Sequence, residues 1–163
     1  LRVDANEGWK KKELALERIK WLQDQNVEFI EQPMPAAQFD DIKWLRDKVD
    51  MPIIADESVI RLSDLPTLAQ AYDGINIKLM KSTGVREALR MIHTARALNM
   101  KIMMGCMIES AVAISAAAQL SPLIDYADLD GNVLITNDPF DGVRNIKGKL
   151  TLSDKAGIGA TPR

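Results

Sequence analysis

The chain has 163 residues, of which 47% are hydrophobic, so it can bury the core of about one domain. Its net charge of −2 argues against a general nucleic-acid or membrane-surface binder, which would show a basic patch. The single cysteine, Cys106, excludes a disulfide framework and a multi-cysteine zinc site. No apolar run approaches the ~20 residues of a membrane span. We expect a cytoplasmic protein with neither a nucleic-acid nor a membrane partner.

Strand-like apolar runs alternate along the chain with segments of helical periodicity. The predicted strands are 1–6, 27–33, 52–58, 74–80, 101–107 and 126–131. The predicted helices are 9–25, 38–49, 63–72, 85–98 and 110–120. A hairpin is predicted from 143–146 and 150–152.

Apolar residues at helical spacing give the expected core of the two longest helices. The residues predicted to point inward are Leu14, Ala15, Ile19 and Leu22 in the first helix and Val85, Leu89, Ile92 and Ala95 in the fourth. Met103, Met104 and Met107 are predicted to be core residues of the fifth strand. His93 lies between charged residues and is expected to be exposed, which gives no support to a histidine nucleophile.

The alternation of strands and helices predicts right-handed βαβ units around a parallel sheet. The short, nearly uniform interval between units favours a (β/α) barrel over a doubly wound open sheet. No Gly-x-Gly-x-x-Gly turn follows any predicted strand, as a dinucleotide-binding sheet would need. A complete barrel has eight units and about 250 residues. We therefore predict an α/β protein with an incomplete TIM-type barrel over 1–142 and a C-terminal tail over 143–163.

In three predicted strands the apolar run ends at a carboxylate, and in the next one it ends at a lysine. The acids are Asp4, Glu31 and Asp56, and the lysine is Lys78. In a barrel the carboxyl ends of the strands form the active-site face, so the three acids are expected to converge. Oxygen ligands of this kind suit Mg²⁺, with Mn²⁺ also acceptable. The alternative for each acid is a role as a helix cap or loop residue.

Lys78 is predicted to be a general base beside the metal site. A lysine near a bound cation in a dry pocket has a lowered pKa and can take up a proton near neutral pH. The alternative is a structural lysine that pairs with one of the acids.

The sixth predicted strand carries a pair of acids, Asp128 and Asp130, in the sequence Asp-Leu-Asp-Gly. Strand alternation places both on the same face. If that face is the barrel interior, the pair can hold a cationic group such as an ammonium. The alternative is a pair of acids that caps the following loop. Cys106 lies in an apolar run and is expected to pack rather than act as a nucleophile.

These motifs together resemble the enolase superfamily, and specifically its muconate-lactonising subgroup. The resemblance rests on Arg-Val-Asp-Ala-Asn, Ile-Glu-Gln-Pro, Ala-Asp-Glu-Ser and Ile-Asn-Ile-Lys around Asp4, Glu31, Asp56 and Lys78, in the right order over nearly the whole chain. The Asp-x-Asp element at Asp128 narrows it to the dipeptide epimerases of the L-Ala-D/L-Glu type.

The resemblance implies roles for these residues. Asp4, Glu31 and Asp56 are then the Mg²⁺ ligands, and Lys78 is one of two acid/base lysines on opposite faces of the substrate α-carbon. Asp128 and Asp130 bind the α-ammonium group of a dipeptide. The implied reaction is a Mg²⁺-assisted 1,1-proton transfer next to a carboxylate through an enediolate intermediate, as in other members of this superfamily.

The chain also departs from the family pattern. The second lysine belongs to a Lys-x-Lys element on the strand before Asp4, and the family's N-terminal capping domain is absent from these residues. The resemblance thus implies strands three to eight of the barrel, with 143–163 as a tail that joins the capping domain, and an isolated chain that is inactive. A homo-oligomer is compatible with the resemblance. The alternatives are a muconate cycloisomerase, an o-succinylbenzoate synthase or a non-catalytic chain.

Overall fold

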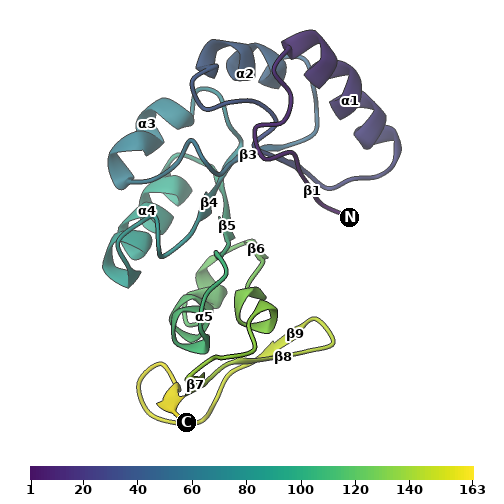
Figure 1. The fold of residues 1–163 in the computed structure, drawn as a ribbon. Helices are drawn as coiled ribbons and strands as arrows, with labels where there is room; N and C mark the ends of the chain where they lie inside the picture. Colours follow the sequence, from purple (N-terminus) through teal and green to yellow (C-terminus); the bar gives the residue numbers. More distant parts are fainter. The chain divides into compact units, whose positions relative to one another are not determined.

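The computed structural model describes all 163 residues, which form two compact units. The N-terminal unit consists of Leu1–Asn76 with His93–Ile102. The C-terminal unit consists of Ile77–Ile92 with Met103–Arg163. Figure 1 shows the elements of each unit. None of the helices is both long and apolar enough to cross a lipid bilayer.

The elements follow the predicted alternation, although most are shorter than the sequence predicted. The first six strands are β1 (Val3–Asp4), β2 (Ile30–Glu31), β3 (Ile53–Ala55), β4 (Gly74–Ile77), β5 (Lys101–Met104) and β6 (Tyr126–Ala127). The α-helices are α1 (Lys12–Asp24), α2 (Phe39–Arg46), α3 (Leu65–Leu68), α4 (Val85–Ala97) and α5 (Ala111–Ala118). Short 3₁₀ helices are η1 (Leu62–Asp64), η2 (Ser121–Leu123) and η3 (Gly131–Leu134). The later strands are β7 (Phe140–Asp141), β8 (Arg144–Ile146), β9 (Lys149–Thr151) and β10 (Thr161–Pro162).

Strands β1 to β6 form one sheet in which the strands follow each other in sequence order. The pairs β1–β2, β2–β3, β3–β4 and β5–β6 are parallel. A doubly wound sheet reverses its strand order at a switch point, and this sheet has no reversal. The predicted succession of parallel βα units is therefore confirmed.

In the N-terminal unit, α1 and α2 pack against the strands with one apolar face each. Ala15, Ile19 and Leu22 of α1 are buried, and so are Ile42 and Leu45 of α2. Figure 1 shows these helices on one side of β1 to β3. The strands β2, β3 and β4 are buried along their full lengths, as expected of a parallel sheet covered by helices.

In the C-terminal unit, the buried Asp138 holds the start of α5. Its Oδ2 accepts a 2.6 Å hydrogen bond from the amide of Ala111, and its Oδ1 accepts one of 3.0 Å from the amide of Phe140. The carboxylate therefore satisfies an amide at the amino end of α5 and ties β7 to that helix.

The predicted C-terminal hairpin is confirmed as the antiparallel pair β8–β9. Its loop consists of Lys147 and Gly148, which both have positive φ angles, 52° and 79°. Two such residues make the type I′ turn that matches the twist of the two strands.

Three predicted core residues are wrong. Leu14 and Val85 are each 38% exposed, because both lie at the edge of the apolar stripe of their helix. Met107 is 45% exposed, because β5 ends at Met104 and Met107 belongs to the following loop. Met103 and Met104 are buried as predicted, and His93 is exposed as predicted.

Candidate active site

Three acidic side chains lie together where β1, β2 and β3 end. Asp4 and Glu31 are the last residues of β1 and β2, and they pair in the register of the sheet. Asp56 follows β3 directly. One carboxylate oxygen of each residue lies within 4.8 Å of the others. The structure thus brings together the three acids that the sequence predicted to converge.

This carboxylate cluster fits a divalent cation. Glu31 and Asp56 are 5% and 2% exposed, whereas Asp4 is exposed. Two unit charges about 4 Å apart repel each other by roughly 4 kcal/mol at an effective dielectric constant of 20. A cation that takes an oxygen from each acid removes this repulsion. A set of carboxylate oxygens with no nitrogen or sulfur suits Mg²⁺ or Mn²⁺.

Polar groups of the N-terminal unit orient two of the acids. The Nδ2 amide of Asn76 donates a 2.6 Å hydrogen bond to Oε1 of Glu31. The backbone amide of Asn6 donates one of 2.8 Å to Oδ1 of Asp4. Hydrogen bonds to a ligating carboxylate fix the direction of its oxygens, as in known metal sites.

Sequence reasoning did not assign a role to Asn76. A signal was present, because Asn76 stands two residues before Lys78, and alternate residues of a strand share a face. Asn76 is 2% exposed, and its Oδ1 has no hydrogen-bond partner in the chain. That oxygen is available to a water molecule or a ligand.

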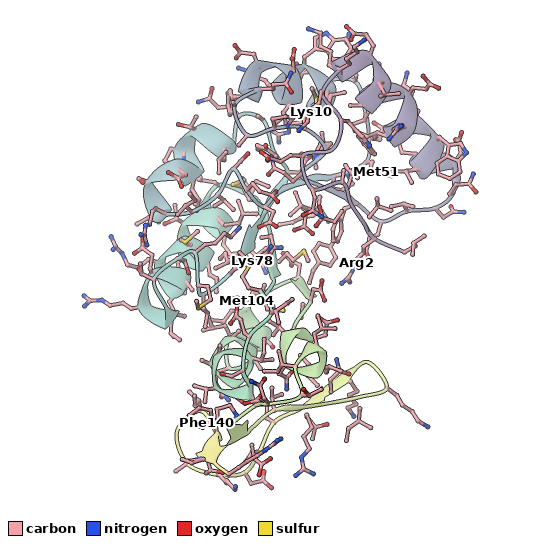
Figure 2. All side chains as sticks on the ribbon, in the orientation of Figure 1. Arg2, Lys10, Met51, Lys78, Met104 and Phe140 are labelled. Atoms are coloured by element: carbon pink, nitrogen blue, oxygen red, sulfur yellow. The ribbon has the colours of Figure 1, made fainter.

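Lys78 belongs to the C-terminal unit and follows β4 directly. Its side chain is half-buried, and Figure 2 labels it just after this strand. Its carbonyl oxygen accepts hydrogen bonds from the amides of Lys81 (2.9 Å) and Ser82 (3.0 Å). The tight turn that follows places Lys78 at the carboxyl end of β4, the position that the sequence predicted.

Asp128 and Asp130 lie just after β6, on either side of the buried Leu129. Both acids are exposed and Leu129 is buried, but the strict alternation predicted for a strand is broken, because Ala127 and Asp128 are exposed in succession. The amide of Asp128 donates a 2.9 Å hydrogen bond to the carbonyl oxygen of Met104, which extends the pairing with β5. The two acids line a cleft of about 730 Å³ within the C-terminal unit.

Cys106 is a neighbour of this acid pair. Burial raises the pKa of its thiol, and the charges of Asp128 and Asp130 raise it further, whereas hydrogen bonds from the backbone of Gly131 and Asp130 oppose the shift. The thiol is therefore protonated at neutral pH, which agrees with a packing role and not with a nucleophile. Glu109 also has a structural role, because its Oε1 accepts a 2.7 Å hydrogen bond from the amide of Met107.

Fold and site together define a (β/α)-barrel protein with a three-carboxylate cluster at its strand ends. Residues 1–163 match the family described as "Enolase C-terminal domain-like" over their whole length. The chain belongs to this family.

The chain is also similar to curated epimerases. It is 54% identical to the L-Ala-D/L-Glu epimerase of Bacteroides thetaiotaomicron, over 98% of this chain and 42% of that protein. It is 49% identical to an L-Ala-D/L-amino acid epimerase of Pedosphaera parvula, over 94% of this chain and 45% of that protein. The chain thus spans somewhat less than half the length of these relatives.

Solved structures show the same fold. A substrate-liganded complex of the L-Ala-D/L-Glu epimerase from Bacillus subtilis superposes with a TM-score of 0.92 at 32% identity, over 99% of this chain and 47% of that chain. The dipeptide epimerase from Cytophaga hutchinsonii, in complex with Mg and the dipeptide D-Ala-L-Val, gives the same TM-score and identity over 100% of this chain and 46% of its own. The predicted incomplete TIM-type barrel is confirmed.

Proposed function

We propose that the intact protein is a dipeptide epimerase of the L-Ala-D/L-Glu type. The observation that carries the proposal is the convergence of Asp4, Glu31 and Asp56 at the ends of three neighbouring strands. The similarity to curated dipeptide epimerases over almost the whole chain supports the same substrate class. The reaction inverts a carbon atom next to a carboxylate by removing a proton and returning it on the other face.

Asp4, Glu31 and Asp56 are the residues that would hold Mg²⁺. The α-proton next to a carboxylate is very weakly acidic, because its removal builds up a second negative charge on that carboxylate. A bound divalent cation supplies the positive charge that stabilises this build-up. The hydrogen bond from Asn76 restricts the orientation of the Glu31 carboxylate, which would help Glu31 to hold the cation.

Lys78 takes the proton from one face of the α-carbon or returns it there. Lys78 is half-buried and follows β4 directly, at the carboxyl edge of the sheet where a general base would face the substrate. Inversion requires a second base on the opposite face. We assign that base to a lysine upstream of Leu1, as the family pattern implies.

Asp128 and Asp130 bind the α-ammonium group of the dipeptide. Both acids are exposed and line the same cleft, so an ammonium group that enters this cleft can contact both. Charge-assisted hydrogen bonds from an ammonium to such a pair are about twice as strong as neutral ones. This contact selects a free amino terminus and positions the second residue of the dipeptide for proton transfer.

The test is epimerisation of L-Ala-L-Glu by the intact protein. Chiral chromatography should show L-Ala-D-Glu accumulating with Mg²⁺ and none after treatment with EDTA, and added Mg²⁺ should restore the reaction. N-acetyl-L-Ala-L-Glu is the matched control, because it lacks the ammonium group and should react poorly. A folded, Mg²⁺-saturated protein that converts no dipeptide would contradict the proposal.

A further inference from the structure

A buried glutamine connects the ends of the strands that carry the three acids. Gln32 follows Glu31 directly, is fully buried at 0% exposure and has a positive φ of 32°. Its carbonyl oxygen accepts a 2.8 Å hydrogen bond from the amide of Glu7, in the loop that follows β1. Its backbone therefore links the ends of β1 and β2.

The side chain of Gln32 reaches the end of β3. Its Oε1 accepts hydrogen bonds from the amides of Asp56 (2.9 Å) and Ser58 (3.2 Å). Two amide donors on the same oxygen also fix the orientation of the side-chain amide. The backbone of one acid is thus held by the residue adjacent to another acid.

The opposite end of the Gln32 amide is anchored just as firmly. Nε2 donates to the carbonyl oxygen of Met34 (2.9 Å), and it lies 2.9 Å from Oγ of Ser58 and 3.0 Å from the hydroxyl of Tyr72. The two hydroxyl oxygens are themselves 2.7 Å apart. A side chain with this many partners in a buried site has a single conformation.

A residue other than glycine is strained at a φ near 32°. It keeps this conformation only where its surroundings hold it in place. The hydrogen bonds of Gln32 supply that restraint. Strained residues that are held in this way are found mainly at functional sites. The atoms that the hydrogen bonds of Gln32 hold in place are the backbone of Asp56 and the chain on either side of Glu31.

We propose that Gln32 is a positioning residue for the metal site, which holds Asp56 at the correct distance from Glu31 and Asp4 through the Asp56 amide. This inference deepens the proposed function and rests on it, because it assumes that the three acids bind a divalent cation. Gln32 contacts neither the cation nor the substrate. It acts by keeping the three acids in their binding geometry before the cation arrives.

The test measures Mn²⁺ binding to the intact protein by electron paramagnetic resonance. Gln32→Met keeps the approximate volume of the side chain and removes the hydrogen bonds that the side-chain amide makes, while the backbone bonds of residue 32 remain. Loss of such an outer-shell partner should raise the Mn²⁺ dissociation constant by about 10- to 100-fold. The matched control is Gln38→Met, which removes an exposed bond to Lys10 and a partly buried bond to Asp41 in the same unit and should leave Mn²⁺ binding unchanged.

A kinetic measurement separates positioning from general damage. The Mg²⁺ concentration for half-maximal epimerisation should rise in Gln32→Met, while kcat at saturating Mg²⁺ should fall much less. If Gln32→Met does not fold, the double variant Ser58→Ala/Tyr72→Phe tests the inference instead. It removes the hydroxyls that hold the Gln32 amide and leaves the Asp56 amide in place. It should weaken Mn²⁺ binding and speed hydrogen exchange at the Asp56 amide.

If Gln32→Met or the folded double variant binds Mn²⁺ as tightly as the unaltered protein does, the inference is overturned while the proposed function stands. Equal weakening in Gln38→Met would also overturn it, because the effect would then be general. If the unaltered protein binds no Mn²⁺, the proposed function itself fails, and the inference fails with it.

Discussion

The Nδ2 atom of Asn76 lies 2.6 Å from Oε1 of Glu31, although the two residues are 45 positions apart in the sequence. Both side chains are buried, and the bond joins the end of β2 to β4. A hydrogen bond to a charged group contributes about 1.5–3 kcal/mol, more than a neutral one. The bond therefore restricts the direction of a carboxylate that belongs to the proposed metal site.

Asn76→Leu removes this bond at nearly constant volume. We expect Mn²⁺ to bind about 10- to 100-fold more weakly, because Glu31 can then turn away from Asp4 and Asp56. Isothermal titration calorimetry on the intact protein measures the effect. Asn132→Leu is the control, since Asn132 bonds to the carbonyl of Val143 in the C-terminal unit. Identical affinities for the two variants would contradict this role of Asn76.

Mg²⁺ should stabilise the folded protein through the carboxylate cluster. A ligand at 100 times its dissociation constant adds about 2.7 kcal/mol to the free energy of unfolding. Thermal denaturation should therefore show a higher midpoint with Mg²⁺ than with EDTA. Asp56→Asn should lose this increase, because it removes one of the three charged ligands. In EDTA it should be no less stable than the unaltered protein, since it relieves the repulsion among the acids. A full Mg²⁺ effect in Asp56→Asn would argue against the predicted ligand set.

Much of this site follows from the sequence, because position along a parallel strand decides which residues meet. Asp4 and Glu31 end their strands and Asp56 directly follows its own, and the carboxyl ends of parallel strands lie at the same edge of the sheet. The partners of Gln32 and Asn76 could not be predicted in this way. Both depend on which side-chain atoms tertiary packing brings within 3 Å of each other.

The errors in the predicted core arise at the edges of apolar stripes and at the end of a strand. Helical periodicity defines the centre of an apolar stripe more sharply than its edges, so Leu14 and Val85 were assigned to the interior although each is 38% exposed. Met107 was assigned to a strand because apolar residues continue past Met104. The strand ends just before Gly105, a break signal that the apolar run on both sides of it outweighed, and Gly131 packs against the loop that Met107 belongs to.

Replacing both acids after β6 should weaken substrate binding specifically. In Asp128→Asn/Asp130→Asn the ammonium group of L-Ala-L-Glu loses two charged partners. At about 1.5–3 kcal/mol for each charge-assisted bond, KM should rise at least tenfold. The increase should be much smaller for N-acetyl-L-Ala-L-Glu, which has no ammonium to lose. Steady-state kinetics with both substrates measures the difference, and an equal change for both would count against an ammonium site.

The hydroxyl of Tyr72 should make the free energy of unfolding depend on pH. Burial raises the pKa of this phenol above its ordinary value of 10.0, although hydrogen bonds with Ser58 and Gln32 oppose the shift. Above pH 10 the unfolded chain ionises Tyr72 before the folded protein does, so the free energy of unfolding should fall as pH rises. Urea denaturation from neutral pH to above pH 10 should show a smaller fall in Tyr72→Phe. Parallel curves for the two proteins would refute this assignment.

In the proposed mechanism Lys78 is one of two bases on opposite faces of the substrate α-carbon. The most direct measurement is deuterium exchange at the Glu α-carbon of L-Ala-L-Glu and L-Ala-D-Glu in D₂O, followed by proton NMR. The unaltered intact protein, saturated with Mg²⁺, should exchange the α-proton of both diastereomers and interconvert them. Lys78→Ala should stop the interconversion and retain exchange in only one diastereomer, the one whose proton faces the remaining base. Continued exchange and interconversion of both diastereomers by Lys78→Ala would contradict the account.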